Sequence, residues 1–66
     1  MCQSDVYVVE GEGESLLMKD VSWIEETEDG LLLKDLDGEQ QQIRARVKYA
    51  DLVSHHIVVE PVTGAG

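Results

Sequence analysis

The stretch Ile43-Arg44-Ala45-Arg46-Val47-Lys48 decides how this sequence is expected to fold. Apolar and basic side chains alternate along it, and successive side chains of a β-strand point to opposite faces of a sheet. The stretch therefore predicts a half-buried strand whose apolar residues face a core and whose basic residues, Arg44, Arg46 and Lys48, face outward. No segment of the sequence shows a sustained apolar stripe at helical spacing, so we expect negligible helix.

Short apolar runs flank this stretch on both sides, separated by Gly and Asp, which is typical of a small all-β domain. The main runs are 6–9, 16–26, 31–36 and 57–59. The run 16–26 predicts either one bent strand or two short strands, with the bend near Lys19-Asp20.

Turn signals divide the runs from one another. Glu28-Asp29-Gly30 and Asp37-Gly38 predict hairpin turns, because Gly tolerates the positive φ that such turns demand. Leu52-Val53 is expected to pair with residues 57–59 as a final hairpin across Ser54-His55. Pro61 cannot donate a ladder hydrogen bond and is expected to end the last strand.

These elements predict an all-β fold: a small antiparallel SH3-like barrel of about six or seven short strands. We expect residues 1–60 to form this single domain and residues 61–66 to form a flexible C-terminal tail. A 66-residue chain buries little core and usually needs a disulfide, a metal or self-association. With one cysteine, Cys2, no intrachain disulfide is available, which leaves a metal, a homodimer or both.

Charge and composition narrow the possible functions. The formal net charge is -9, from 5 basic and 14 acidic residues, so binding to nucleic acid or an acidic membrane is disfavoured. No apolar run is long enough to span a bilayer. The first residues lack the pattern of a secretory signal, and a lone thiol fits a reducing compartment, so we expect a cytoplasmic protein. No phosphate loop, HExxH or CxxC motif is present, and we expect no enzymatic activity.

Cys2 is the candidate metal ligand. A cysteine thiolate binds soft and borderline metals strongly, and at position 2 it lies beside the chain's own amine. Whether Met1 is removed decides which nitrogen atoms join it. Two such termini at a dimer axis would offer a planar nitrogen–sulfur set that suits Ni(II) or Cu(II) better than Zn(II). The alternatives are a small apolar residue at the start of a strand and a disulfide between chains.

Histidine and the basic residues give weaker signals. His55 and His56 are neighbours and would point to opposite faces of a strand, so we expect His55 in a turn rather than a shared metal site. The basic stripe with Tyr7 and Tyr49 could bind RNA. Cross-strand pairing with an acidic residue (Asp35, Asp37 or Glu39) is the preferred interpretation. We expect Trp23 in the core or at a dimer interface.

Several segments follow one another in a recognisable order and spacing: Met1-Cys2, the runs 6–9 and 17–21, and the stretches 38–48 and 52–60. In these segments the sequence resembles the CooT family of small nickel-binding accessory proteins linked to carbon monoxide dehydrogenase maturation. The resemblance implies an SH3-like barrel and a homodimer, with nickel bound by the Cys2 thiolates of two subunits. His56 stands where the family often has Lys, so a second, His-based metal site stays open.

The sequence thus predicts a metallochaperone-like accessory protein that carries Ni(II) to carbon monoxide dehydrogenase or its maturation proteins. The alternative is a metal-free module that binds RNA or a protein through Arg44, Arg46 and Lys48.

Overall fold

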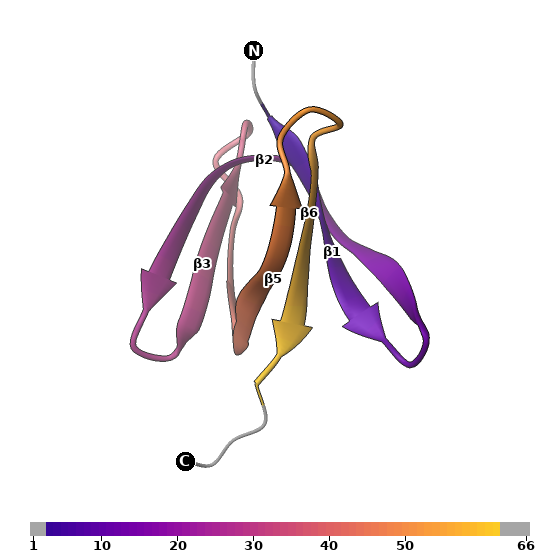
Figure 1. Ribbon diagram of the computed structural model, residues 1–66. Coiled ribbons are helices and arrows are strands. Elements are labelled where there is room, and N and C mark those ends of the chain that lie inside the picture. Colours follow the sequence, from indigo (N-terminus) through magenta and orange to yellow (C-terminus); the bar gives the residue numbers. More distant parts are fainter. Residues whose placement is uncertain (1–2, 63–66) are drawn as a thin grey trace.

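The computed structural model describes residues 3–62, which form six strands and no helix (Figure 1). The strands are β1 (Ser4–Glu10), β2 (Gly13–Thr27), β3 (Gly30–Asp35), β4 (Gln40–Ile43), β5 (Ala45–Asp51) and β6 (His56–Pro61). They make one sheet in the order β4-β3-β2-β1-β6-β5, which curls into a half-barrel. The predicted all-β class is confirmed. Nothing in the sequence indicated that one pair, β1 and β6, runs parallel.

Strand β2 is one bent strand, which settles the alternative left open for residues 16–26. Its first part pairs with β1 and its last part with β3. The bend lies at Asp20, whose φ of 55° is in the left-handed region that Asp tolerates better than most residues. The backbone N–H of Asp20 donates to Asp5 Oδ1 at 3.2 Å. One strand therefore belongs to both halves of the curled sheet.

The two predicted Gly turns are present. Gly30 has a φ of 136° and Gly38 a φ of 89°, in the turns that join β2 to β3 and β3 to β4. The second turn is held by Asp35, whose Oδ1 accepts the backbone N–H groups of Asp37 and Glu39, each at 2.9 Å. Side-chain capping of this kind is a common reason for Asp at turns.

The predicted strand at Leu52-Val53 is wrong. Strand β5 ends at Asp51, and residues 52–55 form the turn to β6. The Asp51 carboxylate accepts the N–H groups of Val53 (3.1 Å) and Ser54 (3.2 Å), which stabilises the turn over an extended chain. These hydrogen bonds, that of Ser54 first, hold the pKa of Asp51 below its usual range. His55 has a φ of 59°, so its predicted place in a turn is confirmed.

The decisive stretch 43–48 is split into two strands. The chain leaves the β4 edge after Ile43, passes through Arg44, and begins β5 at Ala45, because β4 pairs with β3 while β5 pairs with β6. Ala45 is buried as predicted, but Val47 is 42% exposed. The predicted alternation of buried apolar and exposed basic side chains therefore holds only at the start of β5.

The core lies on the concave face of the sheet. Its buried side chains come from all strands except β4, with Leu33 on β3 and Val59 on β6 among the fully enclosed ones. Beyond the predicted domain limit at residue 60, Pro61 still pairs with Ala45 in β6. The N–H of Val62 donates to the carbonyl of Arg44 at 3.1 Å. The predicted tail residues 63–66 lie outside the described residues. Within 3–62 there is no helix that could cross a membrane.

Candidate functional site

Cys2, the predicted metal ligand, lies outside the described residues. The structure does define the end of the sheet from which the chain starts, since β1 begins at Ser4. There the N–H of Asp5 donates to the carbonyl of His55 at 3.0 Å, and the N–H of Leu36 donates to the carbonyl of Asp20 at 3.1 Å. The bend of β2, the β3–β4 turn and the β5–β6 turn thus meet at one end, near the label N in Figure 1. We call this the N-terminal end.

A histidine metal centre is not formed by the described residues. Within residues 3–62, no group of three or more His, Cys, Asp or Glu side chains is placed to hold a metal ion. His56 points instead toward Glu14, with Nε2 and Oε1 3.0 Å apart. Its ring stacks on Tyr7 with 4.2 Å between centroids. The two neighbouring histidines therefore do not form one site. His55 lies in the turn, and His56 belongs to a side-chain cluster.

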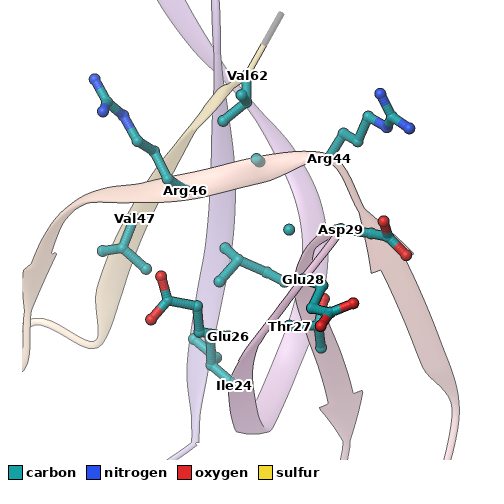
Figure 2. A pocket seen from close by; sticks show the side chains of 12 residues that line it. Ile24, Glu26, Thr27, Glu28, Asp29, Arg44, Arg46, Val47 and Val62 are labelled. Atoms are coloured by element: carbon teal, nitrogen blue, oxygen red, sulfur yellow. The ribbon is translucent and has the colours of Figure 1, made fainter. Parts of the chain in front are cut away.

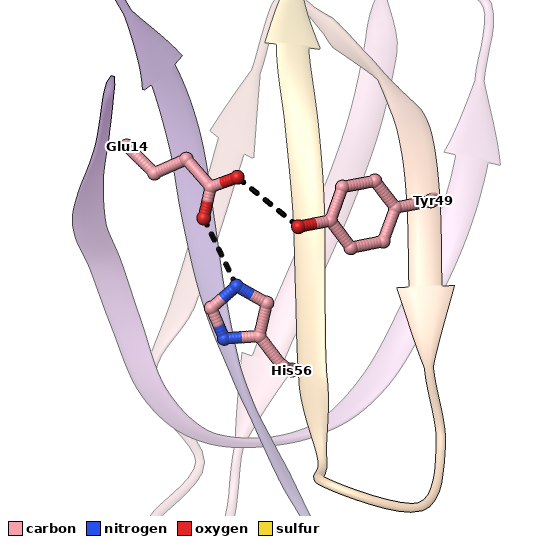
Figure 3. Close-up of polar contacts among 3 residues, drawn as sticks. All are labelled: Glu14, Tyr49 and His56. Carbon is pink, nitrogen blue, oxygen red and sulfur yellow. Dashed lines mark hydrogen bonds and ion pairs between the residues drawn. The ribbon is translucent and has the colours of Figure 1, made fainter.

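The Glu14–Tyr49–His56 cluster joins strands that are distant in sequence (Figure 3). The Tyr49 hydroxyl donates to Glu14 Oε2 at 3.1 Å, while the other carboxylate oxygen contacts His56. Glu14 lies on β2, Tyr49 on β5 and His56 on β6. The Glu14 carboxylate therefore links the β1–β2 hairpin to the β5–β6 hairpin at one edge of the sheet. No local pattern marks this cluster, because its members are 35 and 42 residues apart.

The cluster shifts two ionisation equilibria. The hydrogen bond from His56, helped by that from Tyr49, lowers the pKa of Glu14. Desolvation, followed by the hydrogen bond to Glu14, raises the pKa of Tyr49. A lowered carboxyl pKa means that the folded chain favours the ionised form. An ionised carboxylate and a neutral phenol are thus the states that stabilise this cluster.

This cluster predicts a pH-dependent effect of Glu14→Gln. Because the folded pKa of Glu14 is lowered, its contribution to stability is present above the unfolded pKa of about 4.3 and is lost as pH falls through the folded value. Wild type should therefore melt at a higher temperature than Glu14→Gln near neutral pH, and the difference should close in acid. Thermal unfolding followed across pH measures this. Glu12→Gln, in the adjoining exposed turn, is the matched control. A constant difference at every pH would contradict the prediction.

One member of the basic stripe, Arg46, is paired with an acidic residue. Arg46 Nε lies 2.8 Å from Glu60 Oε2, its register partner across β5 and β6. For Arg46, the predicted cross-strand pairing is confirmed, but its partner is Glu60 rather than the predicted Asp35, Asp37 or Glu39. The acidic partner on β6 comes from long-range pairing that sequence spacing does not reveal.

A pocket of about 780 Å³ lies beside this stripe (Figure 2). Its lining includes Ile24, Leu31 and Val47, and its charged residues are both acidic and basic. In Figure 2, the Arg44 and Arg46 side chains extend away from the pocket on either side, while Glu26 lies beside its apolar lining. A mixed rim of this kind does not provide the cationic groove that a nucleic-acid backbone requires.

Trp23 does not lie in the core, so the first of the two locations predicted for it, the core, is wrong. Its side chain is 52% exposed, and Lys34 Nζ lies 4.9 Å from the ring centroid. Its Nε1–H donates to Glu25 Oε1 at 3.2 Å. The outer face of β2 therefore presents Trp23 to solvent beside a cation, and a dimer interface stays a prediction for it.

The six strands of residues 3–62 form one curled sheet, so the protein belongs to the class of small all-β, barrel-like domains. Over residues 1–60 the sequence matches the family described as CO dehydrogenase accessory protein CooT. The chain belongs to the CooT family, as its sequence pattern predicts.

A solved structure supports this assignment. The chain is 34% identical to the protein in a crystal structure from Carboxydothermus hydrogenoformans, provisionally named CooT, with a TM-score of 0.88. That match covers 94% of this chain and 100% of the other. The chain is also 38% identical over 60 residues to an uncharacterized protein of Methanothermobacter thermautotrophicus, covering 91% of this chain and 89% of that one. The structural match and the family match each span nearly the whole chain, so the fold and the family apply to the entire domain.

Proposed function

We propose that this protein carries nickel(II) during maturation of carbon monoxide dehydrogenase and binds it through the Cys2 thiolates of a homodimer. Membership of a family of carbon monoxide dehydrogenase accessory proteins supports this role. The chain's single thiol supports the choice of ligand. The proposed partners are carbon monoxide dehydrogenase or its maturation proteins, in the cytoplasm, where a reducing environment preserves a free thiol.

The donor set favours nickel over zinc. A thiolate next to an amine or a deprotonated amide supplies sulfur and nitrogen in one plane, a geometry that nickel(II) and copper(II) accept and tetrahedral zinc does not. The sequence has one cysteine, so a second chain is needed to supply a second thiolate. The ion is cargo in this proposal rather than a permanent part of the protein.

The alternative of an RNA-binding module has less support. Arg46 is paired with Glu60, and Tyr49 donates its hydroxyl to Glu14. Tyr7 is already stacked on His56. An RNA complex through this face should weaken steeply with added salt and disappear when Arg44 and Arg46 are replaced by Ala. Nickel binding should change with neither.

The test is a nickel titration of wild type and Cys2→Ser. We expect the variant to lose the thiolate-to-nickel absorption and at least about 100-fold in affinity, because even groups outside the ligand sphere often contribute 10- to 100-fold. His55→Gln and His56→Gln are controls that remove imidazoles and keep the thiolate, and both should retain the absorption. Unchanged nickel affinity in Cys2→Ser would exclude the thiolate site.

A further inference from the structure

A carboxylate lies on the core face of β2. Glu26 is the ladder partner of Leu31, which is buried in the core, and it follows Ile24, which packs against the core cluster. Because alternate residues of a strand share a face, Glu26 lies on the same side of the sheet as Ile24. Among residues 3–62 its carboxylate has no salt-bridge partner, and the side chain is exposed. A charge on this side of a sheet is rarely enclosed without an opposite charge.

Strand β5 places an apolar side chain on the same face. Val47 is the ladder partner of the fully buried Val59, yet Val47 itself is 42% exposed. Strand β5 pairs only with β6, and residues 23–27 of β2 pair only with β3. The pocket of about 780 Å³ is lined by both segments, with Glu26 and Val47 in its wall (Figure 2). The pocket is therefore an uncovered part of the core face.

The pocket combines an apolar lining with an acidic group. Three acidic and two basic residues line it: Glu26, Glu28, Asp29, Arg44 and Arg46. Arg46 is paired with Glu60, and both arginine side chains extend away from the pocket in Figure 2. Glu26 lies beside the apolar lining. An aliphatic chain that ends in a cation fits this arrangement, because its stem can contact apolar side chains while its charge meets the carboxylate.

We propose that this pocket binds a basic side chain from an extended segment of a partner protein. The formal net charge of -9 attracts a cationic partner. Strand β5 has one unpaired edge, which offers backbone groups to an added strand. The β2–β3 turn in the pocket wall lies at the opposite end of the sheet from the N-terminal end (Figure 1). The inference therefore goes beyond the nickel proposal and does not depend on it.

The test is titration of the capped peptide Ala-Val-Lys-Val-Ala into the isotope-labelled full chain at physiological salt, followed by NMR. We expect the largest shift changes in the amides of residues 24–31 and 44–47. Glu26→Gln should raise the dissociation constant at least about tenfold, as expected for loss of a charge-assisted hydrogen bond. Glu25→Gln is the matched control. It removes the same charge from the outer face of the same strand, where Glu25 accepts from Trp23, and should bind as wild type does.

A second peptide separates charge from apolar contact. Norleucine in place of the lysine keeps the unbranched stem and removes the cation. This peptide should bind wild type at least about tenfold more weakly than the lysine peptide. Glu26→Gln should bind both peptides with similar affinity, because the two changes remove one shared interaction. Thermal unfolding verifies that the variants are folded.

Three results would overturn the inference. The first is no change in the pocket amides at millimolar lysine peptide, which would leave Glu26 only as an inward charge that hinders edge pairing. The second is equal weakening by Glu25→Gln and Glu26→Gln, which would indicate general attraction to an acidic protein. The third is equal binding of the two peptides by wild type.

Cys2→Ser separates this inference from the proposed function. It should abolish nickel binding and leave the affinity for the lysine peptide unchanged. Peptide binding that depends on Glu26 in a protein that does not bind nickel would establish the pocket and reject the nickel role.

Discussion

Gly30→Ala should destabilise this protein by more than about 3 kcal/mol, enough to unfold much of a chain this small. A Cβ at Gly30 would overlap the carbonyl oxygen of Ile43 and lie 2.9 Å from the Cα of Arg44. Both are backbone atoms, at the point where the chain crosses from β4 to β5, and cannot rotate away. The φ of 136° adds strain for any residue with a side chain. Domains of this length are stable by only roughly 3–10 kcal/mol.

Substitutions at two other glycines distinguish the steric overlap at Gly30 from the cost of its positive φ. Gly38 has a φ of 89° with open space around it, so Gly38→Ala reports the conformational cost alone, which we expect to be about 1–2 kcal/mol. Gly13 has open space and no positive φ, so Gly13→Ala should have little effect. Urea unfolding of the three variants measures the series. Equal destabilisation by Gly30→Ala and Gly38→Ala would show that the overlap with Ile43 and Arg44 is not important.

Leu33→Ala should have the next largest effect, a loss of about 2–5 kcal/mol, as expected for truncation of a buried Leu. Leu33 is fully buried on the concave face and belongs to the core cluster with Val6 and Val59. A half-barrel has few other layers that could move inward to fill the cavity. Urea unfolding should show a lower midpoint with an unchanged slope. Leu16→Ala, at a half-exposed position, is the control and should cost less than about 1 kcal/mol. Similar losses in both variants would contradict this view of the core.

The parts of the fold that depend on neighbouring residues were predictable. The Gly turns at residues 30 and 38 follow from the backbone freedom of glycine, and the bend near Asp20 lies where the sequence predicted it. The error at Leu52-Val53 has a local cause as well. Two apolar residues suggested a strand, but the Asp51 carboxylate stabilises a turn through hydrogen bonds to the backbone.

Long-range pairing was not predictable from these patterns. The parallel pairing of β1 with β6, the Arg46–Glu60 ion pair and the Glu14–Tyr49–His56 cluster all join residues far apart in the chain. Alternation along a strand identifies its faces but not its neighbours. The candidate metal ligand has a different origin. Thiolate chemistry made Cys2 a candidate ligand for nickel or copper, and the family resemblance selected nickel between them.

The central claim is that the Cys2 thiolates of two chains share one nickel ion. Nickel K-edge X-ray absorption on protein loaded with one nickel per two chains tests it most directly, because sulfur and lighter ligands scatter differently at their characteristic distances. We predict two sulfur neighbours per nickel in wild type, and none in Cys2→Ser treated in the same way. A wild-type nickel shell made of nitrogen and oxygen alone would contradict the claim.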